Sequence, residues 1–359
     1  MLSAKLASSS NTSTTSSWNS YEMRRHSQLA VLALAAVFAA TLLPATSAHA
    51  EITVKLATLA PEGTVWYRAV RTIADRWAEI SNGEVKVKIY PGGVVGNETS
   101  IVRKMRIGQL HAGAITSVGL ADIEASAMVT QSPMLIHNYG ELDYVMERMG
   151  PKFEGLLQDK GFVVLNWSDA GWMHIFTKKP MLVPEDAAKF KMFAFEGDSS
   201  AIEAYKASGL RPVVLAATDV LPSLQSGLLS GFPNTPLAAL SQQWFALAPH
   251  MLDMGWAPLV AATVIRKDVW DSIPEKYHAE FMKVAREAGR ESAREVRRQD
   301  RKAIEVMQKY GLTVHPLPAG ARERWQTASA RSWPTVRKMV GDAVFNETLG
   351  YLQEYRAAK

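Results

Sequence analysis

The order of strand-like and helix-like segments limits the possible folds of this chain more than any other feature. Residues 51–59 and 85–89 alternate apolar and polar side chains as strands do, and residues 111–116 have the composition of a short buried strand. Between these strands, residues 65–80 and 101–107 carry apolar side chains at helical spacing. A β-α-β-α-β order of this kind predicts a parallel sheet with helices on its faces.

The same order starts again further along the chain. Strands are expected at residues 162–167, 173–177, 192–195 and 212–215, with a helix at 200–208 among them. This second set of segments predicts a second α/β lobe that follows the first.

A long helix is predicted after a strand-like segment at residues 259–265. It opens near Ser272 with Pro274 in its first turn, and it extends to Tyr310, where Gly311 ends it. With a rise of 1.5 Å per residue, such a helix is roughly 50 Å long. A helix of this length is expected to cross both lobes.

The N-terminal region has the three parts of a secretory signal. Arg24 and Arg25 precede an apolar run over residues 29–43, and the small residues Ala48 and Ala50 mark a cleavage site before Glu51. We therefore expect residues 1–50 to be removed on export.

Two further expectations come from this region. Residues 1–22 are rich in Ser and Thr and precede Met23, which is an alternative start that leaves a signal of ordinary length. The apolar run is shorter than the roughly 20 residues that span a bilayer. No membrane insertion of the exported chain is expected.

The composition excludes several kinds of protein. The 359 residues include no cysteine, so disulfides, thiolate nucleophiles and cysteine metal ligands are excluded. An exported chain of this length without disulfides must depend on a large core, and it exceeds the usual size of a single core. The net charge of +5 is too small, and too evenly mixed with acids, to indicate nucleic-acid binding.

The sequence also contains none of the common catalytic or cofactor-binding motifs. It has no phosphate-binding loop, no Gly-x-Gly-x-x-Gly, no His-Glu-x-x-His and no Gly-x-Ser-x-Gly. Asp169 and Glu196 could form an acid/base pair, but the sequence gives no distance between them. We expect a binding protein without cofactor or metal rather than an enzyme.

Two stretches in the second half carry the most specific pattern. Residues 183–195 predict a turn and a short helical start at Pro184 that lead into a strand. Residues 224–236 predict a helix that ends near Gly227, followed by a turn of small residues that presents Asn234.

These stretches, with the segments around them, resemble one protein family. The segments that carry the resemblance are residues 57–61, 108–113, 178–180, 184–186, 190–192, 224–227 and 234–236, and the helix that begins at Pro274. Their order and spacing resemble those of the DctP-like solute-binding subunits of tripartite ATP-independent periplasmic (TRAP) transporters, over essentially the whole exported chain.

The resemblance implies an α/β protein of the two-lobed periplasmic-binding-protein type, the Venus flytrap, with mixed sheets. Lobe I is expected to comprise residues 51–171 plus about 259–296, and lobe II residues 172–258 plus about 297–359. The helix at 274–310 would span both lobes, and a ligand cleft would lie between them.

The resemblance also implies a function. The protein is expected to capture a small organic solute in the periplasm, to close around it, and to deliver it to the small and large membrane subunits of a TRAP transporter driven by an ion gradient. Neither a cofactor nor ATP is implied for this chain.

The chain departs from the family at its ligand anchor. In the family, an arginine on the strand that follows the Lys-Pro stretch forms a bidentate bridge to the substrate carboxylate, and that position is Phe193 here. A second arginine of some members falls at about Met173. Neither a benzene ring nor a thioether replaces a planar fork of donors, and an unpaired buried carboxylate costs several kcal/mol. A carboxylate held in the usual way is therefore disfavoured.

The expected site is aromatic and modestly polar. If the correspondence with the family holds, the ligand-binding residues are Phe193, Asn234, Trp172, Met173, Phe195, Trp256, Asp169 and Glu62. The expected ligand has an apolar or aromatic body, is neutral or cationic, and is oriented by Asn234. Trp167 and Trp66 are further candidates, although helical spacing favours a core position for Trp66.

Three alternatives remain open at this point. A carboxylate ligand could be held by another cation, with Lys178, Lys191 and Arg211 as candidates. The same scaffold could also serve a periplasmic enzyme, or a sensor that reports solute to a membrane receptor.

Overall fold

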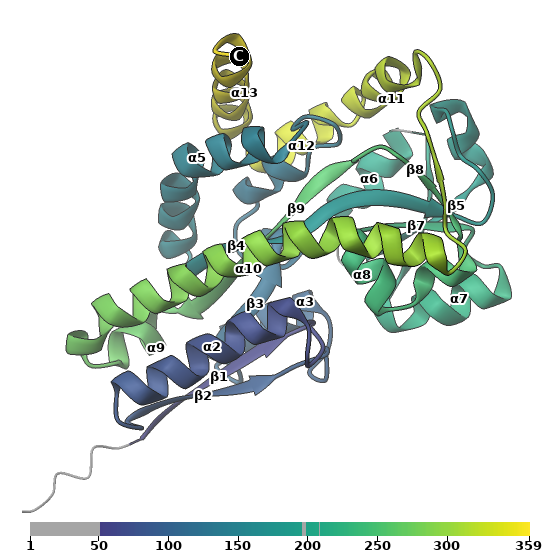
Figure 1. Cartoon of the computed structure of the whole chain (residues 1–359). Coiled ribbons are helices and arrows are strands. Elements are labelled where there is room, and N and C mark those ends of the chain that lie inside the picture. The colour runs from purple at the N-terminus through teal and green to yellow at the C-terminus, as the bar shows by residue number, and fades with distance from the viewer. Residues whose placement is uncertain (1–50, 196–198, 208) are drawn as a thin grey trace, which may run out of the picture. The chain divides into compact units, whose positions relative to one another are not determined.

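The computed structural model describes residues 51–195, 199–207 and 209–359 (Figure 1). The predicted export signal at residues 1–50 lies outside the described residues, as does Glu196 of the candidate acid/base pair. In the part of the chain that is described, no helix is both long enough and apolar enough to cross a membrane.

The first segments fold as the alternating pattern predicts. Strands β1 (Ile52–Thr58), β2 (Val85–Tyr90) and β3 (Ala112–Thr116) alternate with helices α2 (Val65–Ile80) and α3 (Glu98–Arg106). Strand β1 pairs in parallel with both β2 and β3. This arrangement brings the carboxyl ends of β1 and β3 to the same edge of the sheet.

Two long antiparallel strands follow, so the sheet is mixed rather than parallel throughout. Strand β9 (Ala257–Arg266) pairs antiparallel with β3 and with β4 (Phe162–Thr177). The two strands predicted at residues 162–167 and 173–177 are in fact one continuous strand, β4. The pattern between them was misread because β4 has register shifts at Val164/Asn166 and Asp169/Gly171, and a bulge breaks the alternation of side chains.

The other end of β4 belongs to a second group of strands. These are β5 (Lys191–Phe195), β6 (Arg211–Leu215), β7 (Gly231–Asn234), β8 (His250–Leu252) and β10 (Thr313–His315). Strand β5 is parallel to β6 and β7, whereas β7 is antiparallel to β4. The strand order is β2-β1-β3-β9-β4-β7-β5-β6, with β8 and β10 off this path. Strand β4 therefore joins the two groups.

Helices flank this sheet. The shorter ones are α4 (Ser117–Ala121), α6 (Ser199–Ala207), α7 (Val220–Ser226), α8 (Pro236–Ser241) and α9 (Lys267–Ser272). The others are α5 (Tyr139–Asp159), α11 (Ala321–Ala330), α12 (Trp333–Val340) and α13 (Asp342–Ala357).

Helix α10 (Glu275–Lys309) is the predicted long helix (Figure 1). Its 35 residues give a length of about 52 Å. Pro274 is its N-cap, and α9 is a separate short helix before it. Helix α10 contacts α2, β4 and α8. Phe281 and Ala285 pack into the core beside β1 and β2, and Met307 packs into the core beside β5 and β7.

Candidate functional site

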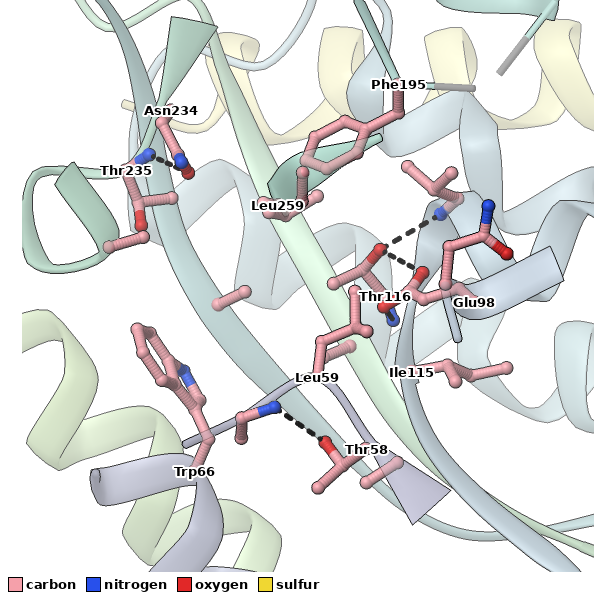
Figure 2. Close-up of a pocket in the computed structure, with 18 of the residues that line it drawn as sticks. Thr58, Leu59, Trp66, Glu98, Ile115, Thr116, Phe195, Asn234, Thr235 and Leu259 are labelled. Atoms are coloured by element: carbon pink, nitrogen blue, oxygen red, sulfur yellow. Dashed lines mark hydrogen bonds between the residues drawn. The ribbon is translucent and has the colours of Figure 1, made fainter. Parts of the chain in front are cut away.

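A cavity of about 640 Å³ lies where several strands end. Its wall includes Thr58 at the end of β1, Thr116 at the end of β3, Phe195 at the end of β5 and Asn234 at the end of β7 (Figure 2). Crevices outside the carboxyl ends of strands are the usual ligand sites of open α/β sheets, because side chains and backbone groups from several loops converge there.

Trp66 contributes one wall of the cavity from the first turn of α2. The hydroxyl of the N-cap Thr64 accepts a hydrogen bond from the Tyr67 N–H, which fixes the start of this helix. The indole Nε1 of Trp66 donates a hydrogen bond of 3.2 Å to the main-chain oxygen of Asp169, at the bulge of β4. The indole ring is therefore held in place at the cavity wall (Figure 2).

Glu98 brings a carboxyl group to the cavity wall from the first turn of α3. Its Oε1 accepts a hydrogen bond of 2.8 Å from the Thr116 N–H, and its Oε2 accepts bonds from the Thr116 hydroxyl and the Gly119 N–H at 2.7 and 2.8 Å. Glu98 is 7 % exposed. Burial raises the pKa of the Glu98 carboxyl, and the bonds from Thr116 and Gly119 act in the opposite direction.

Asn234 and Thr235, at the end of β7, add polar groups to the cavity wall from the second group of strands. The Oδ1 atom of Asn234 accepts a hydrogen bond of 2.8 Å from the Thr235 N–H, while no described residue pairs with its Nδ2. The buried hydroxyls of Thr235 and Ser168, which also line the cavity, have no hydrogen-bond partner within the described ranges. These groups are available to a bound solute.

Basic side chains are absent from the described part of the cavity wall. No Lys, Arg or His occurs among the described residues that line it, and Glu98 is the one charged residue there. The undescribed internal residues, 196–198 and 208, are Glu, Gly, Asp and Ser and add no base.

Phe193, which the resemblance places where the family is expected to have an arginine, lies in the cavity wall behind Phe195. The two rings meet edge to face with centroids 4.6 Å apart, and Trp244 packs on Phe193 at 5.9 Å. Phe193 is 0 % exposed, whereas Phe195 is half-buried and its ring extends toward the cavity (Figure 2). Phe193 therefore supports the wall, and Phe195 supplies the accessible ring.

Two further residues of the expected site also line the cavity. Met173 of β4 is half-buried there. Trp256 is buried and packs edge to face on Trp325, with ring centroids 5.9 Å apart. Together with Phe193, Phe195 and Asn234, they bring five of the eight expected residues to one cavity.

The other three expected residues lie elsewhere. The ring of Trp172 packs edge to face on Tyr139 at 5.1 Å, and the carboxyl of Asp169 pairs with Arg297. Glu62 is exposed, and neither it nor Trp167 lines the cavity.

The basic residues considered as alternative anchors also lie outside the cavity wall. Lys178 donates a hydrogen bond to the main-chain oxygen of Leu224, and Lys191 and Arg211 are exposed. None of the three lines the cavity. The described part of the chain also contains no group of three or more His, Cys, Asp or Glu side chains that could hold a metal ion.

Sequence reasoning missed Glu98 and assigned Trp66 mainly to the core. Asn97 could have indicated where helix α3 begins, because an Asn before a polar first turn is a typical N-cap. In the structure, its side chain accepts a hydrogen bond from the Ser100 N–H. The pattern does not show that the next residue, Glu98, meets Thr116 eighteen residues later, because that contact is tertiary.

The chain matches the model of one protein family over residues 56–339, described as bacterial extracellular solute-binding protein, family 7. It is 25% identical over 254 residues to a C4-dicarboxylate-binding periplasmic protein of Rhodobacter capsulatus, which covers 68% of this chain and 74% of that protein. It is 21% identical over 250 residues to a 2,3-diketo-L-gulonate-binding periplasmic protein of Escherichia coli, with 68% of this chain and 75% of that protein covered.

Solved structures share the fold. A TRAP periplasmic solute-binding protein of Ralstonia eutropha, with bound (S)-2-acetolactate, has a TM-score of 0.79 at 20% identity and covers 84% of this chain and 99% of its own. A TRAP periplasmic solute-binding protein of Sulfurospirillum deleyianum, with bound succinate, has a TM-score of 0.76 at 22% identity. The match covers 83% of this chain and 98% of that protein's chain. The expected α/β periplasmic-binding-protein fold is thereby confirmed.

Proposed function

This chain belongs to family 7 of the bacterial extracellular solute-binding proteins, and we propose that its cavity captures one small organic solute without a guanidinium–carboxylate bridge. The observation that carries this proposal is that the described wall of a 640 Å³ cavity has no Lys, Arg or His side chain. The solute would be held mainly through an apolar or aromatic body.

Charge distinguishes this cavity from one suited to an organic acid. The two solved relatives hold acetolactate and succinate. A carboxylate that enters a wall without a cation loses its hydration and gains no ion pair, which costs several kcal/mol. Glu98, when ionised, would add repulsion. An organic-acid ligand is therefore disfavoured for this chain.

The wall offers contacts suited to an apolar body. Trp66 and Phe195 present aromatic rings from two different strand groups, and Leu59 and Leu259 extend the apolar surface (Figure 2). Aromatic rings supply large contact areas at small cost in conformational entropy. The Nδ2 of Asn234 would orient a polar group of the solute.

Capture would serve transport. We propose that residues 51–171 with about 259–296 form lobe I, that residues 172–258 with about 297–359 form lobe II, and that ligand selects the closed arrangement of the two. Helix α10 packs against cores beside both strand groups, as a helix shared by two lobes would. The protein would act in the periplasm and pass its solute to the small and large membrane subunits of a TRAP transporter.

The ligand class can be tested on protein purified from the exported fraction without refolding. Native mass spectrometry is expected to show a bound organic solute, and thermal shifts should follow readdition of that solute, because a specific ligand raises the melting temperature by mass action. Phe195→Ala should reduce the shift, whereas Ile107→Ala, a change of an exposed residue outside the cavity wall, should not. A strong shift from C4-dicarboxylates or keto acids would contradict the proposal.

The transport role needs its own test. Cells that lack the TRAP membrane subunits should lose uptake of the radiolabelled solute while the exported protein still binds it. Conversion of the solute to a product by the purified protein would instead indicate an enzyme.

A further inference from the structure

The charge of the solute can be inferred from the buried acids around the cavity, on the basis of the proposed function. Four acidic side chains are buried among the described residues: Glu98, Glu141, Asp169 and Asp300. Glu141 pairs with Arg356 and Asp169 pairs with Arg297. Neither Glu98 nor Asp300 forms an ion pair with any described residue, and of these two only Glu98 lines the cavity.

The partners of Glu98 hold its carboxyl in place without neutralising a charge. All three are neutral donors: the N–H and the hydroxyl of Thr116, and the N–H of Gly119. A carboxylate has about four lone-pair positions, so three bonds leave room for one more donor. Buried charges in proteins are usually paired, and at Glu98 no described side chain does so.

Two N–H groups at helix starts near the cavity are occupied by the protein's own acids. Glu98 accepts from the Gly119 N–H in α4, and Asp300 accepts from the Leu237 N–H at 2.9 Å in the first turn of α8. Free N–H groups at such ends would otherwise favour an anion. These two donors are therefore not available to an anionic group of the solute.

The aromatic rings add to this preference. Trp66 and Phe195 line the cavity, and the faces of aromatic rings attract cations. Figure 2 shows Glu98 and Thr116 together at one side of the cavity, with Trp66 at the other side of the view. A solute can therefore meet a carboxyl at one end and aromatic surface along its body.

We propose that the solute is an organic cation, an amine protonated at neutral pH or a quaternary ammonium, whose charged group lies beside Glu98 while its apolar body contacts Trp66 and Phe195. Its charge would supply the counter-ion that the neutral donors around Glu98 do not. Glu98 thereby becomes the residue that determines specificity for charge.

Three probes of nearly the same shape test this inference on the unaltered protein. They are 2-phenylethylammonium, 2-phenylethanol and phenylacetate, measured by calorimetry at pH 7.5 after removal of any co-purified solute. The ammonium probe should bind at least tenfold more tightly than the alcohol, and phenylacetate should bind most weakly. Raising the salt concentration should weaken the ammonium probe alone.

Variants locate the effect. Glu98→Gln should weaken the ammonium probe at least tenfold, and Glu79→Gln, at an exposed position of α2, should leave its affinity unchanged. The comparison of the three probes needs no variant, so it holds even if Glu98→Gln does not fold.

The outcomes separate this inference from the proposed function. Tightest binding of the alcohol, or binding of none of the probes, overturns the organic cation and leaves standing the proposal that the solute is held without a guanidinium–carboxylate bridge. Tightest binding of phenylacetate overturns both. Ammonium affinity that survives Glu98→Gln in a folded variant also overturns the role given to Glu98.

Discussion

Asp300, in the middle of helix α10, accepts a hydrogen bond of 3.1 Å from the main-chain N–H of Trp172 in β4. The other carboxyl oxygen of Asp300 accepts from Leu237 at the start of α8. One side chain thus ties the long helix to the strand that joins the two strand groups and to the helix that follows Asn234. This connection lies directly behind the cavity wall at Thr235.

The titration of Asp300 should affect stability in a defined pH range. Burial raises its pKa to about 6, well above the value of roughly 3.9 in an unfolded chain. A raised pKa means that the folded state binds this proton more tightly than the unfolded state does. The stability that protonated Asp300 contributes is therefore fully present below about pH 4 and is lost as the pH rises through about 6. Between these limits, the wild type should lose roughly 3 kcal/mol of unfolding free energy relative to Asp300→Asn.

Urea unfolding at several pH values from 4 to 7 measures this difference. The exposed Asp75→Asn variant, which alters a surface ion pair with Arg71, serves as the matched control. Its free energy of unfolding should depend on pH in the same way as that of the wild type. If the free energies of unfolding of Asp300→Asn and the wild type changed with pH in the same way, Asp300 would not titrate between pH 4 and 7.

Gly171 is expected to be intolerant of any side chain. Its φ of +117° is unfavourable for other residues, and an added Cβ would lie 2.8 Å from the Cβ of Thr235 and 2.9 Å from Oδ2 of Asp300. Gly171→Ala should lower the free energy of unfolding by about 3 kcal/mol, from strain and overpacking together. Chemical denaturation measures the loss.

Gly161 offers the control for this prediction. It also has a positive φ, +84°, but an added Cβ there meets nothing within 4 Å. Gly161→Ala should therefore cost about 1 kcal/mol, from the backbone alone. Equal losses in the two variants would show that the close packing around Gly171 is unimportant.

Arg297 holds two acids together near the bulge of β4. Its guanidinium pairs with buried Asp169, forms bonds of 2.6 and 2.8 Å to Asp143, and lies 4.2 Å from the ring of Tyr139. Arg297→Met leaves the Asp169 carboxylate buried without its partner and should cost about 3 kcal/mol of stability. Thermal and urea unfolding measure this loss.

A double variant tests the cause. Because the cost comes from the unpaired charge, adding Asp169→Asn to Arg297→Met should recover a large part of the lost stability. A double variant no more stable than Arg297→Met would show instead that packing of the Arg297 stem is what matters.

Phe193→Arg tests whether one substitution can supply the arginine anchor that the resemblance leads us to expect at this position. Phe193 has no exposed surface and packs against the rings of Phe195 and Trp244, so a guanidinium there would be buried against apolar groups of the described structure. We expect a loss on the order of 4 kcal/mol, with no gain of carboxylate binding.

Phe193→Leu is the matched change, since it keeps an apolar side chain and should cost about 1 kcal/mol. Circular dichroism melts and calorimetry with succinate check both variants. A stable Phe193→Arg protein that binds succinate would mean that this position opens readily to the cavity.

Local pattern was sufficient for most elements of the first strand group. The apolar spacing of Trp66 to Ile80 and the alternation at Val85 to Ile89 match α2 and β2, because amphipathic periods of 3.6 and 2 follow from burial of one face. The same reading divided β4, since the bulge at Asp169/Gly171 interrupts the period. The β-α-β-α-β order predicted the parallel pairing of β1 with β2 and β3. The antiparallel pairing of β9 with β3 and β4 could not be predicted, because period alone does not distinguish parallel from antiparallel neighbours.

The sequence likewise predicted some residues of the candidate site correctly and placed others there that lie outside the cavity wall. Asn234, Phe195 and Met173 were expected from motif correspondence and line the cavity, whereas Trp172 and Asp169 sit on the same strand as Met173 but lie outside the wall. Along a strand, side chains alternate between faces and a bulge shifts that alternation, so proximity in sequence does not place a residue in a cavity.

Residue types and their order established the family and the α/β class, and they led to the expectation that Phe193 stands where the family has an arginine. Folding in three dimensions settled the rest: Phe193 stands behind Phe195, and Glu98 reaches the wall through Thr116. The physical reason is that burial and charge pairing depend on contacts between distant segments, and these exist only once β4 and α10 have joined the two strand groups.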